Sequence, residues 1–361
     1  MKKILLTGAS ATAPEEVISN QELVTSFNQY VKSYNEAHAA KIAGGLLEPL
    51  KESSEAFILS ASGILRRHVI DKKGILDPAI MQPIVPERRN DQLSLQAEMA
   101  VNAAKIALSN AHKTPEEVDA LLLSCSSFQR TYPAVSIEVQ AALGCQGYAY
   151  DMNVACSSAT FGLQAGYNAL KANAAKVVLI INPEICSAHL NFHDRDSHFI
   201  FGDACTATVL ETEDTCQSSE AFEILSTKSL TRFSSNVRNN FGFLNRTWPQ
   251  TCTAADKLFM QQGRQVFKEV TPLAANFILE HLKENHLQPQ DIRRFWLHQA
   301  NIKMNQLIMQ KVLGEPASFD KAPIILDEYA NTASAGSLIC FAQHHHDFVK
   351  NEMLIIIQGI G

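Results

Sequence analysis

The sequence has no apolar run that approaches the roughly 20 residues needed to cross a bilayer, so we expect no membrane insertion. The apolar run after Lys2 and Lys3 ends at Thr7, which is shorter than the roughly 7 to 15 residues of a signal-peptide core. We interpret it as a first strand. Positive charge is not in excess either, because 31 Lys and Arg stand against 37 Asp and Glu, a formal net charge of -6. This balance gives no reason to expect a nucleic-acid partner.

The eight cysteines lack the arrangement of a disulfide framework or a zinc site. They are scattered along the chain with no C-x-x-C pair, at positions 125, 145, 156, 186, 205, 216, 252 and 340. This scatter is typical of reduced thiols and favours a cytoplasmic location. The run 344–347 (HHHD) could suggest a metal site, but consecutive residues on a helix point in different directions. We therefore expect no metal.

What is present indicates a large, well-packed α/β protein. A chain of 361 residues exceeds one ordinary core, so two packed halves are expected. Short apolar runs alternate with longer segments of helical period, which predicts α/β layering. We expect strands at 3–7, 120–124, 148–153, 177–182, 207–210, 294–297 and 353–358. We expect helices at 94–111, 157–172, 262–285 and 301–313, and a loop at 188–199.

The two halves have a related rhythm. Residues 94–124 and 262–297 each give a long helix, a link that contains proline and acidic residues, and a strand. We interpret this as a weak internal duplication, divided by the polar stretch ETEDTCQSSE. The predicted domains are therefore 1–215 and 216–361, with an inserted helical segment near 28–52.

Cys156, His298 and Asn331 each stand where an apolar run gives way to small or polar residues. Cys156 precedes a predicted helix, whose N-terminus would lower the pKa of the thiol and hold an oxyanion. His298 lies between a predicted strand and a helix, and we expect a strand before Asn331. Each residue alone has a structural explanation: Cys156 as a buried core cysteine, His298 as a core histidine with its hydrogen bonds made, and Asn331 as an asparagine in a turn. Together they fit the carboxyl ends of strands, where sites gather in layered α/β folds.

Four stretches resemble the thiolase-like condensing enzymes, specifically β-ketoacyl-acyl-carrier-protein synthase III. They are NVACSSATFGLQ around Cys156, FIFGDACTATVL, LHQAN around His298 and YANTASAGS around Asn331. Similarity extends over nearly the whole chain and includes SNQEL near the start and SGILRRHV at 62–69. The resemblance implies a thiolase-like α/β fold, in which two duplicated βαβαβαββ halves form a five-layered α-β-α-β-α core.

The resemblance also implies an acyltransferase of fatty acid biosynthesis. Cys156 would take an acyl group from acyl-CoA, after which malonyl-acyl-carrier-protein (malonyl-ACP) would bind and lose carbon dioxide. His298 and Asn331 would donate hydrogen bonds to the thioester oxygen of the resulting enolate. No metal or redox cofactor is implied. The implied partners are acyl-CoA, acyl carrier protein and a second copy of the chain in a homodimer.

The resemblance also implies which residues lie near coenzyme A. Phe57 and Ala61 stand where the family has a Trp and an Arg that enclose the adenine of coenzyme A, so that clamp is weakened or replaced. Arg195 matches a residue near the coenzyme. An alternative interpretation of Arg195 is a salt bridge within its own loop, to Asp194 or Asp196.

Other contacts concern the acyl chain and the carrier protein. Tyr132 matches a position that crosses the dimer interface to bound the partner's acyl pocket, and Gly263 is assigned to substrate binding. The segments 28–52 and 238–246 resemble a longer branch of the family that uses medium-chain primers. The basic rim expected to receive the acidic carrier protein consists of Lys268, Lys303 and Lys311.

The end of the sequence departs from the family pattern. Family members continue from a Gly-rich loop into a last strand of about ten residues, whereas this sequence stops at IIIQGIG. The resemblance places Gly359 and Ile360 in the loop that supplies the second oxyanion N–H. The second half is expected to lack the final strand.

Two other functions stay open at this point. One is a related acyltransferase of secondary-metabolite or signal synthesis that uses the same triad. The other is a non-catalytic homologue that binds acyl thioesters or the carrier protein. Retention of all three triad residues favours an enzyme, because a binding protein has no need of a nucleophile.

Overall fold

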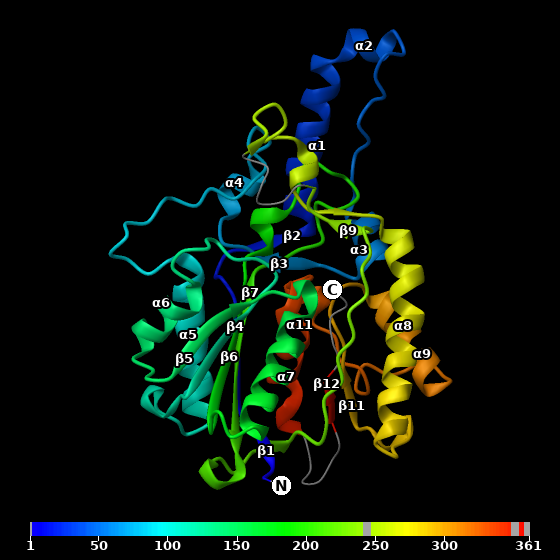
Figure 1. Cartoon of the computed structure of the whole chain (residues 1–361). Coiled ribbons are helices and arrows are strands. Elements are labelled where there is room, and N and C mark those ends of the chain that lie inside the picture. The colour runs from blue at the N-terminus through cyan, green and yellow to red at the C-terminus, as the bar shows by residue number, and fades with distance from the viewer. Residues whose placement is uncertain (1, 241–246, 348–353, 357–361) are drawn as a thin grey trace.

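The computed structural model describes residues 2–240, 247–347 and 354–356 (Figure 1). Its helices are α1 (Asn20–Ala37), α2 (Ala39–Ala43), α3 (Glu55–Ser62), α4 (Lys72–Leu76), α5 (Leu95–Asn110), α6 (Val135–Leu143), α7 (Ser158–Lys171), α8 (Gly263–Glu284), α9 (Ile302–Leu313), α10 (Leu326–Tyr329) and α11 (Gly336–His344). Its strands are β1 (Ile4–Thr12), β2 (Val17–Ser19), β3 (Arg66–His68), β4 (Ala120–Ser124), β5 (Tyr148–Met152), β6 (Val177–Glu184), β7 (Ala204–Thr212), β8 (Phe222–Glu223), β9 (Val237–Arg238), β10 (Met260–Gln261), β11 (Arg294–Trp296) and β12 (Leu354–Ile356).

A six-stranded sheet in the order β5-β4-β6-β7-β1-β8 forms the centre of the first half. Strands β5, β4 and β6 are parallel, whereas β7 is antiparallel to both β6 and β1. Along the chain, β1, α5, β4, α6, β5, α7, β6 and β7 follow the expected β-α-β-α-β-α-β-β order. The parallel strands β4, β5 and β6 therefore end at the same edge of the sheet, where the loops that follow them meet.

The helices and sheets form five layers (Figure 1). α5 and α6 cover the outer face of the large sheet, and α7 and α11 lie side by side on its inner face. Beyond them β11 and β12 pair in parallel, and α8 packs with α9 as the last layer. Within the described residues, this second sheet consists of β11 and β12. The domain boundary at 215 and 216 stays a prediction.

Small residues bring α5 close to β1. The buried face of α5 is built largely from alanine, including Ala103 and Ala107. A Cβ added at Gly8 of β1 would lie 2.2 Å from the carbonyl oxygen of Ala107. Only glycine at this position allows the helix to approach so closely.

The inserted segment is a helical arm that projects from the body at the top of Figure 1. It begins earlier than predicted, because Ser19 caps α1 at Asn20. The chain returns along α1, and two asparagines of that helix hold its backbone. Asn28 bonds the N–H and C=O of Ser53 at 2.8 and 3.1 Å, and Asn35 bonds those of Leu50 at 2.9 and 3.0 Å.

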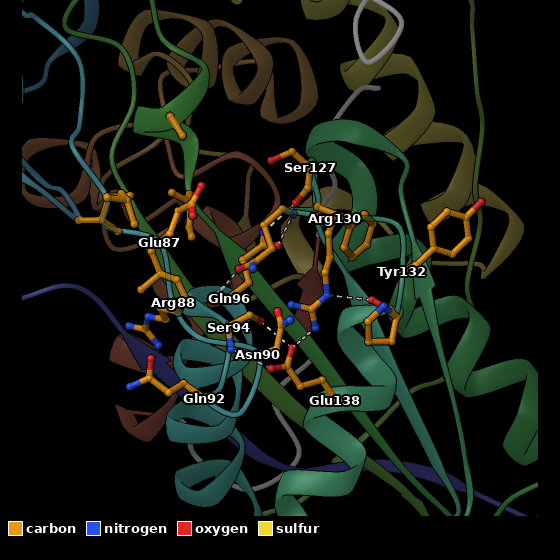
Figure 2. A pocket seen from close by; sticks show the side chains of 18 of the residues that line it. Glu87, Arg88, Asn90, Gln92, Ser94, Gln96, Ser127, Arg130, Tyr132 and Glu138 are labelled. Atoms are coloured by element: carbon orange, nitrogen blue, oxygen red, sulfur yellow. Dashed lines mark hydrogen bonds and ion pairs between the residues drawn. The ribbon is translucent and has the colours of Figure 1, made fainter. Parts of the chain in front are cut away.

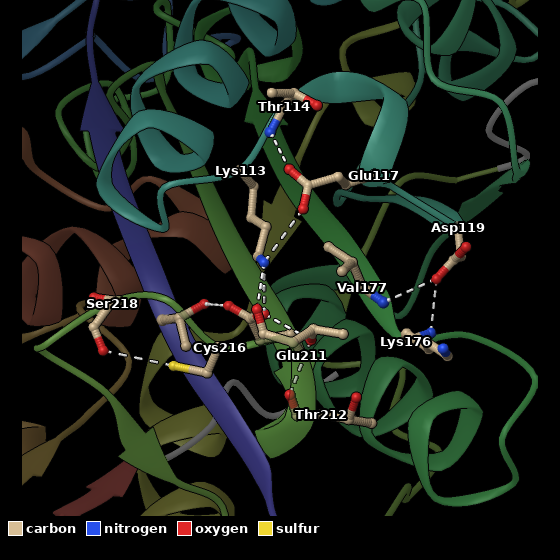
Figure 3. A network of polar contacts seen from close by, with 12 residues as sticks. Lys113, Thr114, Glu117, Asp119, Lys176, Val177, Glu211, Thr212, Cys216 and Ser218 are labelled. Carbon is tan, nitrogen blue, oxygen red and sulfur yellow. Dashed lines mark hydrogen bonds and ion pairs between the residues drawn. The ribbon is translucent and has the colours of Figure 1, made fainter.

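A buried ion pair joins the loop after α5 to β7 (Figure 3). The Lys113 ammonium lies 3.1 Å from the carboxylate of Glu211, and both side chains are almost completely buried. The hydroxyls of Thr7 and Thr215 each donate to Glu211 at 2.7 Å. The pair therefore has the additional hydrogen bonds that a buried charge needs.

Candidate active site

Cys156 lies in a 3₁₀ turn, η2 (Ala155–Ser157), directly before α7. Ala155 adopts a φ of 48°, a left-handed conformation that is strained for a residue with a Cβ. Cys156 is partly buried and packs against the apolar cluster that includes Phe201 and Ala333. The turn between strand and helix thus presents the thiol where the sequence predicted it.

The expectation of a lowered pKa for Cys156 was wrong. Burial, and after it the negative charge of Glu184, raise the pKa of the thiol to about 12. The sequence indicated the helix that follows Cys156 but not the buried carboxylate beside it. At neutral pH the resting residue is therefore a protonated thiol.

His298 stands between β11 and α9 and is partly buried. Burial lowers the pKa of its imidazole to about 4, and a hydrogen bond to the backbone of Ala333 opposes that fall. The ring is therefore neutral at pH 7. In the same LHQAN motif, the buried Gln299 accepts from the N–H of Ile325 at 3.1 Å. Asn301 caps α9 and donates to the carbonyl of Ala61 at 2.5 Å, so these two residues have structural roles.

Asn331 is buried beside the FIFGD segment. Its N–H donates to the carbonyl of Ile200 at 3.0 Å, and its C=O accepts from the N–H of Gly202 at 3.1 Å. The prediction of a strand before Asn331 was wrong, because the short helix α10 precedes this residue. Asn331 itself forms only an isolated β-bridge, with Phe201. The N–H of Ala333 donates to Asn331 Oδ1 at 3.0 Å. That bond identifies the amide oxygen and leaves the NH2 group available to a ligand.

The structure brings the three predicted residues together through one turn. The 3₁₀ turn η8 (Ala333–Ala335) packs against η2, which carries Cys156. The backbone of Ala333, in η8, also forms hydrogen bonds with the side chains of both His298 and Asn331. Residues from the two halves of the sequence thus meet between the two central helices.

Sequence reasoning missed the acidic groups beneath this turn. Glu184 and Asp203 are fully buried, and burial raises the pKa of each to about 6. Asp203 accepts from the N–H and hydroxyl of Ser187 and from the N–H of Ile70. The signal available in the sequence for Glu184 was an acidic residue at the end of a largely apolar strand, VVLIINPE.

Phe57 and Arg195, both expected to lie near the coenzyme, are in contact with each other. The guanidinium carbon of Arg195 lies 4.0 Å from the centroid of the Phe57 ring, a cation–π geometry. Nε of Arg195 donates to the carbonyl of Glu52 at 2.7 Å. In the alternative interpretation, a salt bridge to Asp196, the nitrogen–oxygen distance is a long 3.5 Å. Arg195 is thus held by the end of the inserted arm and by Phe57.

Tyr132 is 89% exposed and lines a pocket of about 1010 Å³. Figure 2 shows it apart from Arg130 of the same loop, which turns to Glu138. The lining of this pocket includes Ile185 and His189 near the end of β6 but none of the three triad residues. The structure of one chain therefore places Tyr132 on the surface.

The other predicted contacts lie on α8 and α9. Gly263 is exposed and begins α8. Lys268 on α8 and Lys303 and Lys311 on α9 are also exposed, and these two helices pack together. No ion pair joins these lysines to another group in the described part of the chain. Gly359 and Ile360 lie outside the described residues, as do 241–246 of the predicted primer segment.

One group of potential metal ligands lies together. His345 and His346 occupy the 3₁₀ turn η9 (His345–Asp347), with ring centroids 3.7 Å apart. With Glu220 they offer three ligand atoms within 4.8 Å of one another. The argument that successive residues on a helix diverge therefore does not describe this turn. Within the described ranges, no helix is long and apolar enough to span a membrane.

Comparisons with known proteins agree with the geometry. The family model of 3-oxoacyl-[acyl-carrier-protein] synthase III matches residues 150–229, and the model of its C-terminal part matches residues 282–361. The chain is 56% identical over 322 residues to beta-ketodecanoyl-[acyl-carrier-protein] synthase of Pseudomonas aeruginosa, covering 89% of this chain and 92% of that one. It is 26% identical over 366 residues to beta-ketoacyl-[acyl-carrier-protein] synthase III of Ehrlichia canis, covering 100% and 96%.

A solved structure supports the same fold. The crystal structure of 3-oxoacyl-[acyl-carrier-protein] synthase III from Aquifex aeolicus aligns with a TM-score of 0.72 at 22% identity, covering 99% of this chain and 95% of that one. The prediction of a thiolase-like fold is confirmed.

Proposed function

Because this chain belongs to the 3-oxoacyl-[acyl-carrier-protein] synthase III family, we propose that Cys156, His298 and Asn331 are its catalytic residues. The chain is an acyltransferase of fatty acid biosynthesis that condenses an acyl primer with malonyl-ACP. The observation that carries the assignment of residues is the η8 turn. It packs against the Cys156 turn while Ala333 within it contacts both His298 and Asn331.

In the first step Cys156 Sγ attacks the thioester carbon of acyl-CoA. The bond to the coenzyme sulfur breaks, an acyl-cysteine forms, and the proton of the Cys156 thiol ends on the departing coenzyme A. Because the resting thiol has a raised pKa, this proton must leave as the new S–C bond forms.

In the second step malonyl-ACP loses carbon dioxide and the enolate attacks the acyl-cysteine. His298 Nε2 and the Asn331 amide NH2 donate to the thioester oxygen as its negative charge develops. The attack releases the Cys156 sulfur, which recovers a proton. The overall balance of acyl primer, malonyl thioester, carbon dioxide and free thiol requires no electron carrier, and the two hydrogen-bond donors stabilise the enolate oxygen, so we propose that no metal or redox cofactor takes part.

The primer is a medium-chain acyl-CoA. The support is the 56% identity to a beta-ketodecanoyl synthase. Since condensation lengthens the primer by two carbons, a ten-carbon product requires an eight-carbon primer. Octanoyl-CoA is therefore the expected substrate, gripped at its coenzyme end by Arg195 and Phe57.

The working form is a cytoplasmic homodimer. β5 is an edge strand of the large sheet, and its Tyr148 and Tyr150 are 44% and 40% exposed. Such an edge favours pairing with a second copy. In such a dimer, Tyr132, which lies in the loop before α6, would reach the partner's acyl pocket. The free state of all eight cysteines supports a reducing compartment.

Intact-mass spectrometry tests this function. The protein is mixed with acetyl-, hexanoyl-, octanoyl- or decanoyl-CoA, with Cys156→Ser treated in parallel. We expect the mass of one acyl group to be added, fastest from octanoyl-CoA, and no addition in the variant. A folded protein that gains no acyl group from any primer would instead be a non-catalytic binding homologue.

A further inference from the structure

Glu184 ends β6 directly beneath the active-site turns, and its side chain is fully buried. Its carboxylate accepts both the N–H and the hydroxyl of Ser126, at 3.0 and 2.5 Å. It also accepts both the N–H, at 3.2 Å, and the hydroxyl of Ser334. Ser126 follows β4 in the first half, whereas Ser334 lies in η8 of the second half. One carboxylate thus holds a serine from each half by two bonds.

The Ser334 side of this network leads to the His298–Asn331 pair. Ser334 follows Ala333, whose N–H donates to Asn331 Oδ1 and whose backbone also bonds His298. Ala333 has a φ of 47°, which is strained for alanine. Such a conformation persists only where neighbouring contacts hold it. The two hydrogen bonds that Ser334, the next residue, donates to Glu184 are contacts of this kind.

The Ser126 side leads to the nucleophile in the same way. The carbonyl of Ser126 accepts from Asn153 Nδ2 at 2.9 Å, and Asn153 Oδ1 accepts from the N–H of Ala155 at 2.8 Å. Ala155, which precedes Cys156, is strained in the same way, with a φ of 48°. Both arms of the network therefore end at a left-handed alanine beside a proposed catalytic residue.

We propose that Glu184 is a positioning residue that fixes the Cys156 turn relative to the His298–Asn331 pair, through Ser126 on one side and Ser334 on the other. This inference rests on the catalytic roles proposed above. Glu184 has no bond to any of the three catalytic side chains among the described residues. It acts through the two turns that carry them.

The charge of Glu184 gives the proposal a second, independent readout. Burial raises the pKa of its carboxyl to about 6, and the hydrogen bonds to Ser126 and Ser334 oppose that rise, so it is mostly ionised at neutral pH. The negative charge raises the pKa of four surrounding thiols, those of Cys125, Cys156, Cys186 and Cys205. Removing the charge should therefore make Cys156 easier to deprotonate while loosening its position. A charged residue distant from the Cys156 turn would not change the acidity of this thiol.

The two serines separate the arms of the network, and each variant keeps Glu184. Acylation is measured by intact mass with octanoyl-CoA, and decarboxylation by carbon dioxide release from malonyl-ACP in a Cys156→Ala background. Ser334→Ala should slow decarboxylation about tenfold and acylation much less, because a displacement of about 1 Å is enough for such losses. Ser126→Ala should show the reverse pattern. Equal effects of both variants on both half-reactions would overturn the proposal.

Glu184→Gln keeps the size of the side chain and removes its charge. We expect slower condensation, with kcat reduced and the KM for the primer unchanged, together with iodoacetamide alkylation of Cys156 that begins at lower pH. Peptide mass spectrometry assigns alkylation to Cys156, and the buried Cys340 serves as the internal control for unfolding. Unchanged alkylation of Cys156 in a folded variant would contradict the proposal.

Glu211→Gln is the matched control, because Glu211 is equally buried and hydrogen-bonded but belongs to the Lys113 network of Figure 3. It should leave both the ratio of half-reactions and the alkylation profile of Cys156 unchanged. The alkylation comparison needs no substrate. A wild-type protein that is not acylated would therefore count against the proposed function, whereas an unshifted profile in Glu184→Gln would count against the role of Glu184.

Discussion

At the residue scale, burial acts in opposite directions on the two titratable groups that we propose to be catalytic. It raises the pKa of Cys156 to about 12 and lowers the pKa of His298 to about 4. Burial disfavours the charged form of either group, so the resting site has a neutral thiol and a neutral imidazole. The site is thus different from a pre-formed thiolate–imidazolium pair.

This resting state predicts a steep pH dependence for Cys156. Below its pKa, the thiolate fraction rises about tenfold for each pH unit. We expect alkylation of Cys156 by iodoacetamide to accelerate between about pH 7 and about pH 10 without a plateau, since the raised pKa lies above this range. Measured peptide by peptide, a plateau near pH 8 would show a thiol that is not perturbed.

The separate roles of the triad predict a division of the two half-reactions. Cys156→Ala should lose condensation but still release carbon dioxide from malonyl-ACP, because the proposed mechanism assigns the stabilisation of the enolate to His298 and Asn331. His298→Ala and Asn331→Ala should still be acylated but should lose decarboxylation by about 100- to 1000-fold, the usual effect of removing one donor to a developing oxyanion. A Cys156→Ala protein that condenses at the normal rate would rule out an acyl-cysteine.

At the element scale, the sequence predicted most strands and helices of the core to within a few residues. The strand at 120–124 and the helices at 94–111 and 301–313 were recognisable because apolar periodicity and capping residues agree there. The strand before Asn331 was mispredicted, since the position of Asn331 depends on backbone bonds to Ile200 and Gly202, far away in the sequence. The role of Glu184 was hidden for the same reason, because Ser126 and Ser334 are 208 residues apart.

The contact between the FIFGD segment and Asn331 predicts an effect of Gly202. A Cβ at this position would lie 2.2 Å from the carbonyl oxygen of Tyr329, two residues before Asn331. Gly202→Ala should therefore displace Asn331 and reduce decarboxylation at least about tenfold. Gly44→Ala is the control, because its Cβ would meet nothing closer than 3.4 Å. Normal decarboxylation by Gly202→Ala would show that the backbone adjusts without moving the amide.

At the scale of the whole molecule, the five layers explain why residues from both halves form one site. α7 begins beside Cys156 and α11 begins beside Ser334, and the two helices lie together between the sheets (Figure 1). The proposed active site therefore lies at the N-terminal ends of two central helices. The two outer layers are α5 and α6 on one side, and α8 and α9 on the other (Figure 1).

The exposed lysines of α8 and α9 predict where malonyl-ACP binds. Exposed ion pairs are worth about 0.2–1 kcal/mol each, so changing Lys268, Lys303 and Lys311 together to Glu should raise the KM for malonyl-ACP about tenfold or more. Acylation by octanoyl-CoA should be unaffected, because it requires no carrier protein.

Added salt should weaken the difference between the wild type and the triple variant, since screening reduces both attraction and repulsion. Lys105→Glu is the control, because Lys105 is an equally exposed lysine on α5, in the opposite outer layer. Steady-state kinetics with purified carrier protein would decide the matter. If Lys105→Glu raised the KM as much as a single Lys→Glu change on α8 or α9, the effect would be one of net charge, and the carrier protein would have no defined binding surface on these two helices.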